Sequence, residues 1–370
     1  MDLAPVTDGR SLASFIDVPY RLHVGHQPMW TPPLRRDVAT MLDRGKNPFF
    51  EHAEAEYFLA RRGEEVVGRI AAIHNRLHND VHQDKVGFFG FFDCADDPEA
   101  ARALFDAAAG WLRPRGLDTL RGPASFSVND EFGLLVKGFA TPATILNPYN
   151  PEYYVRLVED AGFKGVMDLV QLQRAASVLP ARLVKGAQAM AKRYGVTVRE
   201  LSKKNFAREV ETIKELYNAA WENNWGFVPL TDNEIRGYAK ELKPILDENW
   251  AMVAETKQGE TVGVALTLPD YNQVLAKLNG RLLPFGWVTA LRQRKKVDAV
   301  RVFALGVKPE YQHTGVAAGL YARHYDTAAR TPQKGGETGW ILEQNTAMNK
   351  AMEAMGGDIV KTYRIYEKPL

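Results

Sequence analysis

The chain has 370 residues, which is long for one domain and enough for two domains that each bury a core. Hydrophobic residues make up 45% and charged residues 25%, a globular composition that excludes a disordered chain. The formal net charge of +2 provides no broad basic field, so we do not expect nucleic acid as a partner.

Further features of the sequence concern its compartment. Cys94 is the only cysteine, so no intrachain disulfide can form and a reducing compartment is expected. The opening MDLAPVTDGR carries an early acid and no apolar run, which predicts that it is not a signal peptide. No uncharged apolar stretch reaches the roughly 20 residues that a spanning helix needs. We therefore expect a cytoplasmic protein.

The chain repeats itself at a nearly constant offset, which indicates a tandem duplication. Three pairs of landmarks share an offset of 195, 195 and 194 residues (225 − 30, 263 − 68 and 356 − 162). The pairs are Trp30 with Trp225, Gly68 with Gly263, and Gly162 with Gly356. We predict two domains, residues 1–175 and 176–370, with a boundary near residue 176. Residues 175–195 are expected to include a linking helix that ends at Gly195.

Each copy has the same predicted order of elements. A helix comes first, and in the second copy it covers residues 206–221, which are apolar at helical spacing. A β-hairpin follows in each copy, with its turn at Gly63 and at Gly259. A strand, a helix, another strand, a short helix ending at a glycine and a last strand complete the copy. This order predicts an α/β fold in which hairpins adjoin a strand–helix crossover.

Small residues stand where an apolar strand ending at Val307 passes into a helix. Gly315, Ala317 and Gly319 would let a ligand approach the backbone N–H groups at the start of that helix. Those donors, with the positive end of the helix dipole, favour phosphate oxygens. The alternative is a tight strand–helix turn that binds no ligand.

Residues 312–317, QHTGVA, resemble the Q/R-x-x-G-x-G/A signature of the GNAT N-acetyltransferase superfamily. The resemblance implies two tandem GNAT-like domains, each a mixed and mostly antiparallel sheet flanked by helices. It implies acyl-CoA as a co-substrate, with no permanently bound cofactor, and a splay of strands at Leu305 and Trp340. The CoA-binding residues that it implies are Leu305, Val307, Gln312, His313, Thr314, Gly315, Val316, Ala317 and Asn345.

The first copy departs from this signature. Asp96, Asp97 and Glu99 stand where a phosphate would need donors, and acids there suit a helix start instead. We therefore interpret residues 1–175 as a degenerate GNAT-like domain that serves the acceptor side. Residues 176–370 would form the domain with the acyl-CoA site.

Longer phrases resemble a bacterial tandem-GNAT family that includes the bacterial ceramide synthases. They include residues 120–139, 147–154 and 220–234. This resemblance implies transfer of a long acyl chain from CoA to the amine of a sphingoid base. The alternatives are an N-acetyltransferase acting on a small amine, a transferase using charged tRNA, and a non-catalytic acyl-CoA-binding protein.

Candidate catalytic groups are less well marked. The usual GNAT acid, a tyrosine, would fall at Met352, and the usual glutamate base would fall at Arg301. Glu222 could take the ammonium proton through water, Asn224 could orient the amine, and Asp130 could reach the same site. Helix capping and turn formation are the alternative roles for all three.

Two other segments have competing interpretations. His74, His78 and His82 have the spacing of a histidine stripe, but we expect a loop there and no metal site. Residues 282–296 run from apolar and aromatic residues into Arg292, Arg294, Lys295 and Lys296. This segment favours peripheral contact with an anionic inner membrane, with an apolar face that could line an acyl channel. The alternative is a buried apolar part with a solvated basic end.

Overall fold

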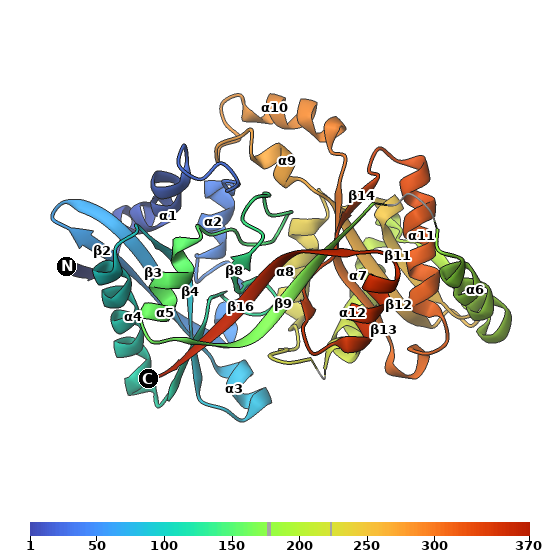
Figure 1. Cartoon of the computed structure of the whole chain (residues 1–370), viewed down its shortest axis with the longest axis horizontal. Helices are drawn as coiled ribbons and strands as arrows, with labels where there is room; N and C mark the ends of the chain where they lie inside the picture. Colours follow the sequence, from blue (N-terminus) through green and yellow to red (C-terminus); the bar gives the residue numbers. More distant parts are fainter. Residues whose placement is uncertain (176–178, 223) are drawn as a thin grey trace. The chain divides into compact units, whose positions relative to one another are not determined.

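The computed structural model describes residues 1–175, 179–222 and 224–370, and it divides the chain into two compact units (Figure 1). Unit 1 consists of Met1–Val170, Leu275–Ala290 and Val360–Leu370. Unit 2 consists of Gln171–Val274 and Leu291–Ile359. The predicted boundary near residue 176 lies outside the described residues.

Unit 1 is built on a mixed sheet with the strand order β1-β2-β3-β4-β5-β16-β9. Strands β1 to β4 alternate in direction, and β4 and β5 run parallel. Its elements are β1 (Asp2–Pro5), α1 (Gly9–His23), α2 (Arg35–Met41), β2 (Ala53–Arg62), β3 (Glu65–Asn75), α3 (Arg76–His82), β4 (Val86–Cys94), α4 (Pro98–Leu112), β5 (Thr119–Gly122), β6 (Ala124–Ser125), β7 (Glu131–Phe132), β8 (Leu134–Lys137), α5 (Tyr153–Asp160) and most of β16 (Asp358–Pro369).

Unit 2 repeats this plan, with the strand order β9-β14-β13-β12-β11-β10. The parallel pair is β13 with β14, and β10 to β13 alternate in direction. Its elements include the end of β9 (Lys164–Ala175), α6 (Ala181–Ala189), β10 (Thr197–Glu200), α7 (Phe206–Trp221), α8 (Asp232–Leu242), β11 (Ala251–Glu255), β12 (Thr261–Pro269), β13 (Val300–Val307), α11 (Val316–Arg330), β14 (Gly335–Glu337), β15 (Ile341–Leu342) and α12 (Thr346–Ala354). Both units confirm the predicted fold, a mostly antiparallel mixed sheet flanked by helices.

Local sequence explains the hairpins and the linking helix. Gly63 and Gly259 have φ angles of +62° and +84°, which glycine adopts without a steric penalty. Helix α6 continues as a π-helical turn, Met190–Tyr194, and ends at Gly195 in the left-handed conformation. The two predicted turns and the predicted helix end are therefore confirmed.

The last strand of each sequence copy belongs to the unit formed mainly by the other copy. Residues Val360–Leu370, at the end of the second copy, lie in unit 1, where Tyr366 pairs with Gly122 of β5. The end of β9, from the first copy, lies in unit 2, where Gln173 pairs with Glu337 of β14. The duplicated segments have therefore exchanged their final strands.

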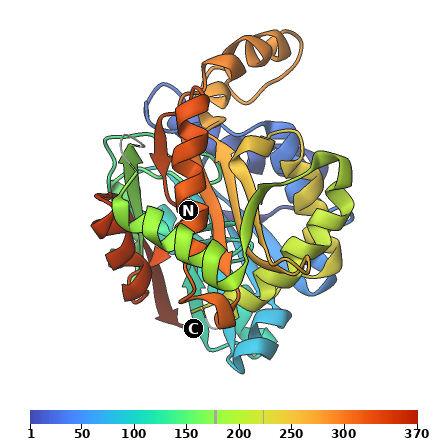
Figure 2. The ribbon, with the colours of Figure 1, turned by 90° about the vertical axis from the view of Figure 1, so that its right-hand side faces the viewer.

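Helix α6 packs closely against α11 within unit 2 (Figure 2). A Cβ atom on Gly186 would lie 2.6 Å from the Cβ of Ala318, and one on Gly319 would lie 2.7 Å from the Sδ of Met190. Gly319 lies inside α11 and not in the loop before it. Its small size is therefore explained by this helix contact, which corrects the interpretation that it opens the backbone to phosphate.

Candidate functional site

Strand β13 of unit 2 loses its parallel partner after its second residue. It pairs with β14 at Val300 and Arg301. The next strand after β14, β15, pairs with β9 instead. Leu305 and Val307 lie beyond the paired part, so one backbone edge of β13 has no strand partner there among the described residues. A register shift in its pairing with β12 places a bulge at Phe303.

The turn after β13 leaves backbone N–H donors at the start of α11 without an acceptor in the described chain. It contains a short 3₁₀ helix, Pro309–Tyr311, and then Gln312 to Gly315. Gly315 caps α11 with a φ of +92° and without a side-chain hydrogen bond. Within the described chain, nothing accepts a hydrogen bond from the amides of Val316 or Ala317. Such amides, at the positive end of the helix dipole, can bind an anion.

Gly315 is required for two reasons at once. Its positive φ disfavours any residue with a Cβ. That Cβ would also lie 2.5 Å from the carbonyl oxygen of Gly186 on α6. Helix α6 therefore forms one wall of the turn, and the sequence analysis did not foresee this contact.

Asn345 is the N-terminal cap residue of helix α12, which follows β14 and β15 in the sequence. Its Oδ1 accepts a hydrogen bond from the amide of Met348 at 3.1 Å, so it is a helix cap in this structure. Met352, at the position of the usual acid, is buried. The hydroxyl of Tyr321 on α11 reaches Met348 Sδ at 3.1 Å, and burial raises the pKa of Tyr321. Tyr321 thus keeps its proton at neutral pH and is a weaker acid than an unperturbed tyrosine.

Glu222 and Asn224 follow the last residue of α7. A Cβ on Gly306 of β13 would lie 2.5 Å from the ring of Trp221, so this end of α7 packs on β13. Glu222 is exposed, and the backbone of Asn224 bonds to Trp221 and Phe227 in a turn. The structure therefore packs Trp221, which directly precedes Glu222, on the same strand that carries Leu305 and Val307.

Arg301 lies on β13 where the usual base would stand, and it is buried. It is in register with Glu337 of β14. Its guanidinium also lies 5.5 Å from the ring centroid of Phe303 and 5.6 Å from that of Trp340. A guanidinium is not a base at neutral pH, so this position can supply positive charge but cannot take a proton.

In unit 1 the corresponding turn, at the start of α4, contains a carboxylate that binds the helix amides. Asp97 caps α4, and its Oδ1 accepts from the amides of Glu99 and Ala100 at 3.1 and 3.2 Å. Burial opposes ionisation, but Arg62 and these amides hold the pKa of Asp97 below its usual value. The helix donors that are open in unit 2 are occupied in unit 1.

The strand edge of unit 1 is closed as well. A Cβ on Gly90 of β4 would collide with the carbonyl oxygen of Ala124, and one on Gly122 would collide with that of Phe89. The amide of Phe91 donates to Ser125 Oγ at 3.0 Å. The polypeptide at 122–125 therefore lies directly against β4, at the bulge that corresponds to the one in β13.

No family model matches the chain. It is 37% identical over 380 residues to the bacterial ceramide synthase of Caulobacter vibrioides, covering 100% of this chain and 98% of that protein. It is also 35% identical to the protein YghO of Escherichia coli, covering 97% of this chain and 93% of that protein. The chain belongs to the family of the bacterial ceramide synthases. As a member of that family it is an N-acyltransferase.

Solved structures show the same fold at low identity. A tandem GNAT protein of the clavulanic acid biosynthesis pathway has a TM-score of 0.58 at 12% identity, covering 100% of this chain and 98% of that one. A probable N-acyltransferase of Enterococcus faecalis has a TM-score of 0.52 at 9% identity, covering 100% of this chain and 73% of that one. The predicted tandem-GNAT architecture is confirmed.

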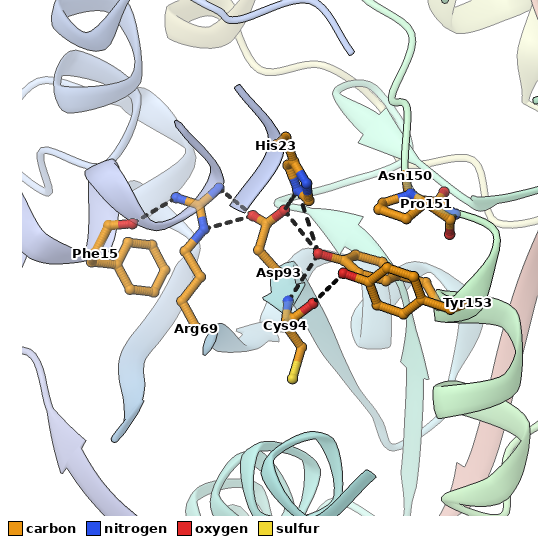
Figure 3. A network of polar contacts seen from close by, with 9 residues as sticks. Phe15, His23, Arg69, Asp93, Cys94, Asn150, Pro151 and Tyr153 are labelled. Carbon is orange, nitrogen blue, oxygen red and sulfur yellow. Dashed lines mark hydrogen bonds and ion pairs between the residues drawn. The ribbon is translucent and has the colours of Figure 1, made fainter. Parts of the chain in front are cut away.

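Near the end of β4 in unit 1, Asp93 is the centre of a polar network that was not predicted from the sequence (Figure 3). Asp93 accepts from Arg69 Nε at 2.8 Å and lies 2.9 Å from His23 Nε2. Burial alone would raise the pKa of Asp93, but the charge of Arg69 and the contact with His23 lower it to about 2. The hydroxyls of Tyr153 and Tyr154 bond to the backbone of Cys94. The network joins α1, β3, β4 and α5.

Asp130 belongs to unit 1, where its Oδ2 accepts from Ser127 Oγ at 2.9 Å and shapes the turn before β7. The adjacent Glu131 is exposed, yet its pKa is raised to about 7. The causes are the low polarity around its carboxyl and the negative charges of Asp93 and Asp130, which outweigh Arg69. The carboxyl of Glu131 therefore changes its charge near neutral pH.

His78 and His82 lie on a helix, α3, and not in the predicted loop, whereas His74 lies on β3. His78 is buried against the rings of His82 and Phe88, and burial lowers its pKa to about 3. Asn75 starts the helix by accepting from the amide of His78, which is why the polar residues there do not break it. In the part of the chain that the structure describes, no group of three or more His, Cys, Asp or Glu side chains is arranged to hold a metal ion.

Proposed function

We propose that the protein transfers a long acyl chain from CoA to the amine of a sphingoid base. Support for the substrates comes from the relative in Caulobacter vibrioides, whose name states ceramide synthesis. Support for the site comes from one contrast within the chain: the α11 turn of unit 2 offers open amides, whereas the α4 turn of unit 1 is capped by Asp97. Residues 176–370 are thus the proposed acyl-CoA domain and residues 1–175 the proposed acceptor domain.

The proposed CoA contacts follow from these groups. The amides of the segment from Gln312, His313 and Thr314 to Gly315, Val316 and Ala317 would bind the pyrophosphate. The free edge of β13 at Leu305 and Val307 would hydrogen-bond the amides of the pantetheine arm. Asn345 would hold the start of α12 beside that arm. No permanently bound cofactor is part of the proposal.

The proposed chemistry is the attack of a neutral amine on the thioester carbonyl. The new C–N bond forms as the C–S bond breaks, the ammonium proton leaves through water, and the thiolate receives a proton. Glu222 is the proposed acceptor of the amine proton, Asn224 orients the amine, and Asp130 is the candidate from the first copy. Correct positioning of the two substrates supplies much of the rate.

Two alternatives make different predictions about the acyl donor. An N-acetyltransferase for a small amine would prefer acetyl-CoA, and a non-catalytic acyl-CoA-binding protein would release no thiol. Action at the cytoplasmic face of the inner membrane, through residues 282–296, is part of our proposal because both proposed substrates carry long hydrocarbon chains. None of the described helices is long and apolar enough to cross a bilayer.

The test is a donor series from acetyl-CoA to palmitoyl-CoA with sphinganine as the acceptor. Free thiol and the amide product are measured together, by a thiol reagent and by mass spectrometry. Each buried CH₂ contributes about 0.8 kcal/mol, so partial burial of the chain should raise kcat/KM by orders of magnitude along the series.

The outcomes separate the candidates. A steep rise with chain length, with amide and thiol in equal amounts, supports the long-chain transferase. A better rate with acetyl-CoA overturns it in favour of an ordinary acetyltransferase. Binding of palmitoyl-CoA without thiol release under every donor points to the non-catalytic protein.

A further inference from the structure

Residues 281–296 display large apolar side chains to solvent. Leu283 and Phe285 are each 76% exposed, Trp287 is 51% exposed and Leu291 is 46% exposed. The last two lie on α10 (Gly286–Gln293), which follows the short helix α9 (Asn272–Leu275) in Figure 1. These exposures contradict the alternative that this apolar stretch is buried core. A water-soluble surface gains nothing from such a cluster, so a partner is expected.

The exposed side chains of Leu283, Phe285 and Trp287 form an apolar tip, and the backbone of this tip is an ordered turn. The amide of Trp287 donates to the carbonyl of Leu282 at 2.9 Å, and that of Val288 donates to Phe285 at 3.1 Å. At its base, within unit 1, the amide of Arg35 donates to Gly280 and its guanidinium to Asn279, both at 3.1 Å. The exposed side chains are therefore held in place before any partner arrives, which lowers the entropic cost of binding.

All Lys, Arg, Asp and Glu side chains in and around the tip are cationic. Residues 271–297 contain six Lys or Arg and no Asp or Glu. The exposed cations that follow the tip are Arg292, Arg294, Lys295 and Lys296. In the described part of the chain none of these four forms an ion pair with an acidic side chain. The partner must therefore be both apolar and anionic.

Helix geometry places the two kinds of side chain at different heights. Trp287 and Leu291 are four residues apart, so they share one face of α10. Arg294 and Lys295 follow at the other end, in a 3₁₀ turn (Arg294–Lys296). Seven residues of helix span about 10 Å, which is comparable to the depth of roughly 5–10 Å to which an apolar face enters the interface of a bilayer.

We propose that this segment docks on an anionic phospholipid bilayer, with Leu283, Phe285 and Trp287 in the acyl region. The cations at the end of α10 then contact the lipid phosphates. The inference deepens the proposed function and rests on it for its purpose, since a bilayer would supply lipid substrates. Its physical basis is independent, because exposure and charge are properties of this segment alone.

The test is flotation of the full chain with vesicles, without substrates present. One vesicle contains phosphatidylcholine, and the other contains equal parts of phosphatidylcholine and phosphatidylglycerol. We expect at least about tenfold stronger binding to the anionic vesicle at low salt, falling at high salt because the cations are exposed. The tip variant, Leu283→Ser/Phe285→Ser, should lose about 100-fold on both vesicles, since each of the two large side chains contributes about tenfold. Arg294→Glu/Lys295→Glu should lose the anionic preference.

Matched controls change exposed residues elsewhere in unit 1. Val81→Ser/Leu146→Ser removes apolar side chains that are 46% and 42% exposed, and should leave vesicle binding unchanged. Arg102→Glu/Arg113→Glu reverses the same amount of charge. Equal loss in a control and in its partner variant overturns the proposal, as does wild-type protein that stays unbound. A tip variant that changes the sedimentation of the protein but not its flotation identifies a second copy of the chain as the occupant instead, and also overturns it.

A second readout separates this inference from the proposed function. Turnover of a water-soluble donor such as octanoyl-CoA, measured without vesicles, should be the same in Arg294→Glu/Lys295→Glu and in the wild type. Vesicle binding without any acyl transfer refutes the proposed function and keeps the docking surface. Acyl transfer from vesicle-borne substrate that is unaffected in the tip variant refutes the docking surface and keeps the function.

Discussion

The two copies use one fold in opposite ways at the same place. In unit 2 the parallel pair β13–β14 separates early and the next helix starts at Gly315 without a side-chain cap. In unit 1 the chain after β5 stays against β4 and the next helix is capped by its own Asp97. The comparison teaches that a ligand site in this fold is made by leaving backbone groups unpaired, and is lost when side chains or chain segments satisfy them.

A single position illustrates the difference. Phe89 pairs with Ala72, and Val302 pairs with Thr267. Because Ala72 and Thr267 are 195 residues apart (267 − 72), the residues that follow, Gly90 and Phe303, are counterparts. Glycine lets the chain at Ala124 approach β4 in unit 1. In unit 2 the chain at Gly339 also comes close to β13, where a Cβ would lie 2.8 Å from the carbonyl oxygen of Val302, but Phe303 carries a side chain where Gly90 has none.

The largest effect is expected in the buried charged network of unit 1, at the ion pair of Asp93 with Arg69. Asp93→Asn removes the partner of Arg69, which then remains buried and unpaired, and this costs about 3–5 kcal/mol. The expected drop in melting temperature is roughly 6–20 °C, measured by calorimetry. The control Asp96→Asn, at an exposed ion pair, should cost less than about 1 kcal/mol.

The pH dependence of this difference has a definite sign. The folded state holds the pKa of Asp93 at about 2, below the value of 3.8 for an unperturbed aspartate. The stabilisation is therefore complete above the unfolded pKa and disappears as the pH falls toward 2. The gap between wild type and Asp93→Asn should shrink over this acid range, and a gap that persists at the lowest pH contradicts the role of the charge.

The next effect concerns the open turn of unit 2. His313→Glu puts a carboxylate beside the free amides, and its repulsion of a pyrophosphate should weaken CoA binding about 30- to 200-fold by titration calorimetry. His313→Gln, which adds no charge, should lose less than about threefold. Glu99→Gln, at the capped turn of unit 1, should not change CoA binding. Equal losses at the two turns would refute the assignment of the site to unit 2.

His313 is a better test position than Gly315. Any side chain at Gly315 would have to adopt φ near +92° and would lie 2.5 Å from the backbone of Gly186. A loss of CoA binding there would mix a folding defect with a binding defect. His313 is exposed, so its variants report binding alone.

The smallest effect is expected at the cap of unit 1. Asp97→Ala removes the acceptor for two helix amides and should lower the free energy of unfolding by about 1 kcal/mol. The melting temperature should fall by roughly 2–4 °C, whereas Glu99→Ala should have less effect because Glu99 caps no amide. CoA binding should be the same in both variants. An unchanged melting temperature for Asp97→Ala would show that the cap is not what distinguishes the two turns.

Local sequence predicted the elements well, because their signals are local. The hairpin glycines and the helix end at Gly195 depend on backbone conformation at single residues. The start of α11 follows from its position after an apolar strand. The polar network was missed, although Arg69 within the apolar stretch GRIAAI was a visible signal of a buried pair. Asp93 lies 24 residues from Arg69 and 70 residues from His23 (93 − 69 and 93 − 23), and no local pattern indicates which residues meet.

The exchange of final strands was also outside the reach of sequence. Both β9 and β16 are 12-residue strands that end a copy. Since the two sheets offer similar edges, the pattern of either strand suits both units. At residues 282–296 the sequence allowed two interpretations, and solvent exposure decided against burial. For the proposed catalytic residues, the sequence supplied positions, and their roles stay predictions.

The placement of β16 has a consequence for how the protein is made. Most of unit 1 lies in the first 170 residues and leaves the ribosome early, but one of its strands comes from residues 360–370. At about 5–20 residues per second, the ribosome needs roughly 10–40 s to make the intervening 190 residues (360 − 170). During that time the edges of β5 and β9 lack their partner, so the nascent chain exposes strands that invite aggregation. We therefore expect the nascent chain to need chaperones until β16, its last strand, has been translated.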